Sequence, residues 1–539
     1  MIRIISIAFF SACACGVWSQ DKGVFTGQLQ LGANAFIKDE RIGAANTPQY
    51  ESEKFGADAW LDLNYKIKGF DFGIRGDLFI NSNLLNPTDS YSDEGIGRWH
   101  IRKRWKSLYL QVGYIYDQIG SGLIFRSYEQ RPLLIDNALR GGSIEYQLGS
   151  NLTLKAFGGR QKNLFSTYSS IIKGASIEGF VSLGSEKAIS LVPGFGIIDR
   201  TWSNKQVDDL ISTLQNYTPK DSIGFFHHSY AFTFYNTLSI GPIAWYSEAA
   251  FKKRGIFFDA DADRLLYTGD NTLGKFRNED GSVLYNSISY GVKGFGATLE
   301  HKRTKNFTFR ADPFTTLNRG LINFLPPMTR VNSFRLKSRY VPAAREISEN
   351  AWQLELRYTL SKKWKLEQYF STISDLSGQL LYRELDHEFH LRRSSRQLYT
   401  FGLQLQRYNQ AIYEGKSGVP MVKTWIPYFE ILRKFKKRRT LRIEAQYMNS
   451  QEDFGSWTFA LVEYTLAPKW SFALSDMYNI KPKKTEKIHY PRADITFVHK
   501  ATRLALSYVK QVEGVVCAGG ICRLEPAFSG VKLGLSSTF

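Results

Sequence analysis

The 539-residue sequence has few of the features that identify most other protein classes. After the first twenty residues it lacks any run of about 18 uncharged apolar residues, so no transmembrane helix is expected there. Only four cysteines are present, which excludes a disulfide scaffold, and no stretch rich in Pro, Gly or Ser separates domains. Acidic residues are the minority charge, 50 against 70 basic ones, and the net charge of +20 suits an anionic partner without identifying it.

The N-terminal segment has the organisation of an export signal. Arg3 precedes an apolar run, and small residues follow it. We predict a signal peptide over residues 1–19, cleaved after Ser19. A lipoprotein is the alternative and would require Cys13 or Cys15 as the modified residue, but the sequence before Cys13 lacks the usual branched aliphatic residue.

The other two cysteines, Cys517 and Cys522, lie close together near the C-terminus. Because an exported chain meets an oxidising compartment, we predict a small disulfide loop. A redox-active or metal-binding pair is the alternative. It has weaker support, because the mature chain offers neither a second cysteine pair nor a histidine close to this one.

From about residue 23 onward, apolar and polar residues alternate with period two, which is typical of strands with one apolar face. In one such segment Leu61 and Leu63 alternate with Asp58, Asp62 and Asn64. Several charged residues of the polar faces are candidates to line a lumen: Asp58, Asp62, Arg75, Asp77, Glu355, Arg357, Arg442 and Glu444.

The connections between these segments alternate between short turns and long loops along the whole chain, and the predicted long loops include 204–224 and 255–281. This alternation is typical of bacterial outer-membrane barrels and has no reason to persist in a water-soluble β-sandwich, which is the alternative. We therefore predict an all-β fold, a transmembrane antiparallel barrel of about 24 strands (range about 22–26), with short periplasmic turns and long extracellular loops. Residues 20–539 then form a single domain.

The last segment has the pattern of a barrel-closing strand. Val531, Leu533, Leu535 and the terminal Phe539 share one alternating face. Such an ending is similar to the assembly signal that outer-membrane barrels present to their insertion machinery. The expected partners are therefore this machinery, outer-membrane lipids and lipopolysaccharide.

A barrel of this size is a wide hole unless something fills it. The first strand begins soon after the expected cleavage site, which leaves no room for an N-terminal plug. Two loops, 118–141 and 305–349, mix apolar residues with arginines and are candidates to fold into the lumen as a basic constriction. Their candidate selectivity residues are Arg126, Arg131, Arg140, Arg319, Arg330 and Arg335. The alternative is that these basic loops lie on anionic lipopolysaccharide.

Three stretches carry a resemblance to a known family: 120–142, 321–330 and 517–539. Together they resemble an uncharacterised family of Bacteroidota outer-membrane β-barrel proteins. The resemblance spans most of the mature chain, implies the barrel fold and an outer-membrane location, and supplies no catalytic residues.

Other motifs are weaker. Asp259, Asp261 and Asp263 have the spacing of a calcium loop, but Arg264 stands where the loop requires Gly, so we predict no metal site. No catalytic motif is present, and neither an enzymatic activity nor a cofactor is predicted. Ser222 lies in a short pattern similar to the O-glycosylation sites of exported Bacteroidota proteins.

The sequence as a whole favours a passive, loop-narrowed pore for solutes. The alternative is a non-conducting membrane component of a secretion, motility or envelope-assembly complex, with periplasmic or surface protein partners. The basic run 433–439 falls at a predicted periplasmic turn, where lipid headgroups or an acidic partner are available. Nucleic acid is not expected there.

Overall fold

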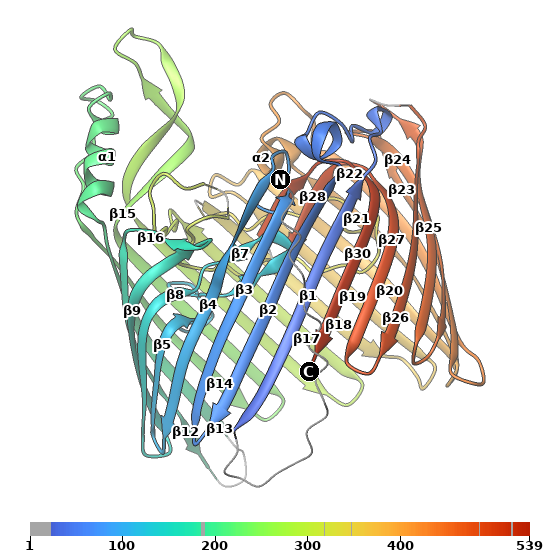
Figure 1. Cartoon of the computed structure of the whole chain (residues 1–539), viewed down its shortest axis with the longest axis horizontal. Coiled ribbons are helices and arrows are strands. Elements are labelled where there is room, and N and C mark those ends of the chain that lie inside the picture. Colours follow the sequence, from blue (N-terminus) through green and yellow to red (C-terminus); the bar gives the residue numbers. More distant parts are fainter. Residues whose placement is uncertain (1–22, 185–188, 317, 347, 484–485, 519–520) are drawn as a thin grey trace, which may run out of the picture.

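A computed structural model describes residues 23–184, 189–316, 318–346, 348–483, 486–518 and 521–539. The strands form one closed antiparallel sheet of 24 strands, as predicted, in which the first strand pairs with the last (Figure 1). Within the described residues no helix is long and apolar enough to cross a membrane. The predicted signal peptide lies outside the described residues.

The elements follow one another around the barrel in chain order. The first half of the wall comprises β1 (Val24–Phe36), β2 (Phe55–Ile67), β3 (Phe70–Ser82), β4 (Tyr91–Trp105), β5 (Leu108–Ile115), β8 (Leu139–Leu148), β9 (Leu152–Asn163), β11 (Ile171–Gly179) continued by β12 (Val181–Leu183), β13 (Ile189–Thr201), β14 (His228–Ile240), β15 (Ile243–Leu265) and β16 (Asn271–Val292). The second half comprises β17 (Phe295–Lys305), β18 (Ser348–Thr359), β19 (Trp364–Ser374), β20 (Leu380–Ser394), β21 (Gln397–Tyr408), β22 (Val422–Lys434), β23 (Arg439–Ser450), β24 (Gly455–Leu466), β25 (Trp470–Pro482), β26 (His489–His499), β27 (Thr502–Gln511) and β30 (Phe528–Thr538).

The connections contain the remaining elements. These are the short helices η1 (Glu40–Ile42), η2 (Gln49–Glu53), η3 (Arg131–Leu133) and α2 (Gln410–Glu414), the longer helix α1 (Asn204–Leu214), and the strand pieces β6 (Glu129–Gln130), β7 (Ile135–Asp136), β10 (Ser166–Thr167), β28 (Gly514–Ala518) and β29 (Ile521–Glu525). Short turns gather at one end of the barrel, which we call the short-turn rim, and long connections gather at the other, the long-loop rim.

Two connections differ from the sequence prediction of plain loops. Residues 255–281 continue β15 and β16 as a long hairpin, and α1 stands beside it above the barrel (Figure 1). Ser203 and Gln206 form a capping box that starts α1. Leu210 of α1 packs in a small apolar cluster with Phe276 of the hairpin, so the two elements support each other outside the barrel.

The two faces of the wall differ as the alternation predicts. On β2, Asp58, Trp60 and Asp62 are buried on the inside, whereas Leu61 is exposed on the outside. Large apolar side chains are exposed on the outer face of many strands, among them Ile74, Leu78, Val112, Ile144, Leu154, Phe234, Phe251, Leu284, Leu299, Trp425, Val462, Leu474, Ile495 and Leu506. An outer band of this kind is typical of a surface that contacts lipid.

A charge on this outer band should be costly. Leu474, on β25, is 67% exposed on the outer face. We expect Leu474→Arg to destabilise the barrel in lipid vesicles by about 2–4 kcal/mol, because an unpaired guanidinium then faces hydrocarbon. Ser475→Arg is the matched control because the next side chain along the strand points into the lumen, and it should cost little. Urea titration of the folded protein in vesicles measures both, and equal effects would contradict the assigned faces.

The C-terminal residue helps to close the barrel. Gly27 N donates to Phe539 O at 2.7 Å, and Phe539 N donates to Gly27 O at 3.0 Å. A Cβ atom at residue 27 would lie 2.3 Å from the Phe539 ring, so a larger residue there would displace this exposed side chain. Val531, Leu533 and Leu535 lie on β30, which pairs with both β1 and β27. Their role in recognition by the insertion machinery stays a prediction.

The interior is packed near the long-loop rim. The main buried cluster combines wall residues with apolar residues of both long connections, including Leu123 and Phe125 from 118–141, and Phe309 and Leu336 from 305–349. Phe125 stacks against Phe157 of β9, with 4.4 Å between ring centroids. Both segments therefore pack against the inner face of the wall.

Candidate functional site in the barrel lumen

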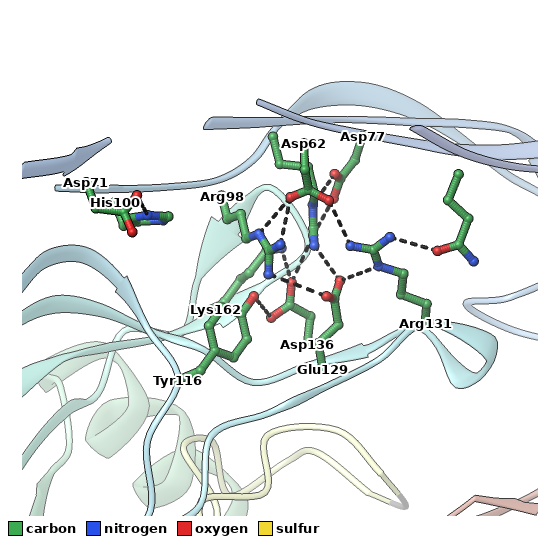
Figure 2. Close-up of polar contacts among 12 residues, drawn as sticks. Asp62, Asp71, Asp77, Arg98, His100, Tyr116, Glu129, Arg131, Asp136 and Lys162 are labelled. Atoms are coloured by element: carbon green, nitrogen blue, oxygen red, sulfur yellow. Dashed lines mark hydrogen bonds and ion pairs between the residues drawn. The ribbon is translucent and has the colours of Figure 1, made fainter. Parts of the chain in front are cut away.

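The segment 118–141 is bound to the wall by an ion-pair network (Figure 2). Arg75 of β3, whose side chain is 1% exposed, pairs with Asp77 of β3 at 2.6 Å, Glu129 at 2.5 Å and Asp136 at 3.1 Å. Arg131 of the segment lies 3.0 Å from Asp62 of β2. The network therefore alternates charges of the wall with charges of the segment.

Asp136 joins further residues to this network. It also accepts from Tyr116 at 2.8 Å and lies 2.5 Å from Lys162 Nζ. Burial by itself raises the pKa of Asp136, but the charges of Lys162 and Arg75 outweigh burial and the pKa is lowered. The carboxylate is therefore ionised at neutral pH and holds two cations.

Acid should loosen the segment 118–141. Because the folded pKa of Asp136 lies below the ordinary value of about 3.9, its stabilising contribution is complete above that pH and is lost as the pH falls through the lowered pKa. We expect faster hydrogen exchange of 118–141 as the pH falls below the ordinary carboxyl pKa of about 3.9, after correction for intrinsic rates. Asp136→Asn should exchange faster already at neutral pH and respond less to acid. An equal acid response in both proteins would contradict this role.

The segment 305–349 is bound to the wall by a second network. Lys337 is fully buried, with its Nζ 2.5 Å from Asp386 and 3.5 Å from Glu388, both on β20. Arg330 of the same segment lies 3.4 Å from Glu388. Tyr428 of β22 donates to Asp386 at 2.9 Å. Cations of the segment therefore pair with carboxylates of the wall.

Wall cations also hold the main chain of this segment. Lys252 of β15 donates to Thr308 O at 2.9 Å, and Lys302 of β17 donates to Pro326 O at 2.5 Å. Arg200 of β13 donates to Arg310 O at 3.0 Å. These bonds tie the segment to three further wall strands.

Exposure of the inner wall rises toward the short-turn rim. On β18, Glu349 and Ala351 are buried near the long-loop rim, whereas Arg357, near the short-turn rim, has a side chain that is 58% exposed. Arg357 pairs with Glu355 at 2.6 Å. On β23, Glu444 is buried and pairs with Arg442, which lies nearer the short-turn rim and is more exposed. On these strands the inner wall is therefore buried toward the long-loop rim and more exposed toward the short-turn rim.

One part of the inner wall borders a cavity of about 510 Å³. It lies along β24–β27, and Arg335 of the segment 305–349 closes one side of it. Its wall residues include Phe459, Glu463, Ser471, Met477, Tyr490, Arg492, Asp494, Thr496 and Arg503. Because Glu463, Ser471 and Arg503 lie close to the short turns, the cavity reaches toward the short-turn rim.

The other three predicted arginines, Arg126, Arg140 and Arg319, have different surroundings. Arg126 stacks on Phe324, with 4.1 Å from the guanidinium carbon to the ring centroid, and so links the two segments. Arg319 is exposed and donates to Leu85 O in the β3–β4 connection. Arg140 belongs to β8 and not to the loop. It is exposed and shares the outer face with Ile144, so it does not line the lumen.

Two further predicted sites lie in connections at the long-loop rim. Cys517 and Cys522 are opposite each other in the β28–β29 hairpin, but their side chains lie outside the described residues, so the disulfide stays a prediction. Ser222 is exposed after α1, and its glycosylation also stays a prediction.

Glu367, Glu388 and His390 bring potential metal-ligand atoms within 4.8 Å of one another on the inner wall. Cations already neutralise these carboxylates, because Lys365 lies 2.6 Å from Glu367 and Lys337 and Arg330 approach Glu388. We therefore assign no metal to the cluster. Asp259, from the calcium-like pattern, pairs with Arg277 at 3.0 Å within the long hairpin.

Sequence reasoning missed the wall residues that hold the segments, chiefly Lys162, Lys252, Lys302, Asp386 and Glu388. Their only sequence signal is a charge on the inward positions of a strand. That signal is shared by many residues that bind nothing, so it does not single them out.

A family model for a family of unknown function (DUF6029) matches residues 1–539. The chain belongs to family DUF6029. None of the curated proteins matches the sequence. The predicted resemblance to an uncharacterised family agrees with this match, whereas the Bacteroidota origin stays a prediction.

Solved structures similar to this DUF6029 chain include several barrels. The P pilus usher PapC translocation pore is 8% identical, with a TM-score of 0.40, and the match covers 96% of this chain and 99% of that one. OccK5 (OpdH) of Pseudomonas aeruginosa is 10% identical, with a TM-score of 0.32 and coverage of 96% and 97%. The siderophore receptor PirA of Pseudomonas aeruginosa is 8% identical, with a TM-score of 0.38 and coverage of 96% and 80%. At this level the likeness does not extend to function.

Proposed function

We propose that this DUF6029 protein is an integral outer-membrane barrel that acts as a passive pore, narrowed by its own segments 118–141 and 305–349. The apolar outer face of the closed sheet supports insertion into a membrane. The charged inner face supports a hydrated path for polar solutes.

The observation that carries the proposal is the unequal filling of the lumen. Charged and polar side chains of β2, β3, β9, β13, β15, β17, β20 and β22 bind the segments, whereas β24–β27 border a cavity of about 510 Å³. A solute path then runs along β24–β27 past Arg335. The segments set its width, and the charges beside it set its selectivity.

Liposome swelling tests the pore directly. Purified protein is reconstituted into liposomes, which are placed in iso-osmotic solutions of uncharged sugars of increasing size, with protein-free liposomes as the control. We expect swelling with the smallest sugars and a sharp decline with size. Absence of swelling with every sugar, in vesicles shown to contain folded protein, would contradict a pore.

The second candidate is a non-conducting membrane anchor for a partner complex. The hairpin of β15 and β16 and helix α1 favour it, because they project above the wall and share an apolar cluster with no role in closing the barrel. Under this candidate, deletion of the hairpin tip would release copurifying subunits from the native complex, and permeability would be absent with or without it.

A further inference from the structure

The cavity along β24–β27 carries more positive than negative charge. Its lining includes the cations Arg335, Arg492, Arg503 and Lys510 and the carboxylates Glu463 and Asp494, and Lys510 pairs with Asp39 outside the cavity at 2.5 Å. Asp494 forms an ion pair with Arg492, whose Nε lies 2.8 Å from the carboxylate. Glu463 lies 3.7 Å from Arg442 of β23 and accepts from Ser471 at 3.1 Å. Both carboxylates of the cavity are therefore already engaged.

Arg335 is one of two cavity cations that have no ion pair within the described part of the chain. Among the described residues its side chain makes no ion pair, and its charged neighbours are Arg339 and Arg492, which are also cations. Burial and these two groups lower the pKa of Arg335 to about 10, so it stays protonated at neutral pH. Arg503, toward the short-turn rim, likewise has no ion pair within the described part of the chain. A guanidinium held in this way is an open site for a carboxylate or a phosphate, whose two oxygens match its planar fork.

Five large side chains with apolar surface also line the cavity, beside the polar residues Ser471, Ser475, Thr496 and Gln511. Phe459, Leu461, Met477, Tyr490 and Val509 face the same space as the guanidinium groups. A cavity of about 510 Å³ has the volume of a small-molecule site, and such sites combine apolar walls with a few placed charges. An inorganic anion alone would leave these walls without a partner. A molecule with an anionic end and an apolar body would use both parts.

We propose that this cavity is a binding site for organic anions, a carboxylate or phosphate group joined to a small apolar body, in which Arg335 binds the anionic end. The site deepens the proposed pore function, because it names the solute class that the narrowed path selects. Since Arg335 belongs to the segment 305–349, the same segment narrows the lumen and provides the ligand contact.

Calorimetry on the full-length protein in detergent tests the site without requiring conduction. The probes are benzoate and phenyl phosphate. Benzyl alcohol is the uncharged counterpart, and inorganic phosphate is the anion that lacks an apolar group. We expect both organic anions to bind and benzyl alcohol to bind at least about tenfold more weakly, because it lacks the charge-assisted bond. The stronger of the two anions identifies the preferred head group.

Variants locate the site. Arg335→Gln should raise Kd for the better anion about tenfold or more, and Arg335→Lys should recover part of the loss. Arg357→Gln is the control, because Arg357 is an inward cation on β18 outside the cavity. Equal binding by wild type and Arg335→Gln, or binding of benzyl alcohol as tight as that of benzoate, would overturn the proposal. So would inorganic phosphate binding as tightly as phenyl phosphate. Anion binding by a protein that fails the swelling test would overturn the pore and leave the site standing.

Discussion

Lys337→Met is expected to release the segment 305–349 from the inner wall. Lys337 is fully buried and supplies positive charge to Asp386, which is buried on the wall, and to Glu388. Removal of one member of a buried ion pair leaves an uncompensated charge and costs about 3–5 kcal/mol. The cost should appear as undocking of the segment, because the wall strands keep their own hydrogen bonds. Limited proteolysis of the folded barrel should then cut within 305–349 at protease concentrations that leave the wild type intact.

Two variants control this result. Arg357→Met removes an inward cation whose side chain is 58% exposed, and it should leave the protease pattern unchanged because exposed pairs contribute about 0–1 kcal/mol. Lys337→Met combined with Asp386→Asn should recover part of the loss, because one stranded carboxylate becomes neutral. Protease resistance of Lys337→Met equal to that of the wild type would show that the pair does not hold the segment.

Arg75→Met is expected to release the segment 118–141 in the same way. Arg75 is shared by Asp77, Glu129 and Asp136, so its loss leaves three carboxylates with fewer cations between them. We expect a cost of about 3–5 kcal/mol in docking, measured as faster hydrogen exchange of residues 118–141 in the folded barrel.

Arg98→Met is the matched control for this network. Arg98 pairs with Asp62 at 2.7 Å but is more exposed than Arg75, and Arg131 also holds Asp62. We expect a smaller acceleration of hydrogen exchange, equivalent to a loss of about 1 kcal/mol in the docking free energy of the segment. Equal acceleration in the two variants, or acceleration spread over the whole barrel, would contradict a specific role of Arg75 in docking the segment.

The wall of this barrel can be predicted from the sequence because each strand is determined by the pattern of its own neighbouring residues. Side chains of a strand alternate between two faces, and one face of each strand must be apolar, so the pattern of Leu61 against Asp58 and Asp62 repeats in strand after strand. The alternation of short and long connections then orders the strands. This is why the strand number and antiparallel order agree with the prediction.

The placement of the two segments in the lumen is harder to predict from the sequence, because it depends on contacts between distant parts of the chain. Lys337 meets Asp386 and Arg75 meets Asp136 across long separations, and no local pattern links the partners. Arg140 shows the related difficulty at an element boundary. The sequence places Arg140 at the end of the predicted loop 118–141. In the structure β8 already begins at Leu139, so Arg140 belongs to the strand and points outward.

The sequence predicts a loop at the extension of β15 and β16 because the apolar residues there do not keep a regular period of two. Register shifts between Lys252 and Gly255, and again between Asp259 and Asp263, break the period-two pattern there. The apolar spacing of Val207, Leu210 and Leu214 is that of a helix face, and it was the available signal for α1.

Single-channel conductance in planar bilayers tests the central claim most directly, that the barrel is a pore narrowed by its own segments. The native protein is compared with a variant in which a short Gly/Ser linker replaces residues 306–346. A variant with the hairpin tip 266–270 shortened is the control, because that tip lies outside the lumen. We expect small, steady conductance for the native and control proteins and a severalfold increase for the linker variant. The same conductance in all three proteins would contradict narrowing by this segment, and a native protein silent beside a conducting linker variant would mean a closed plug.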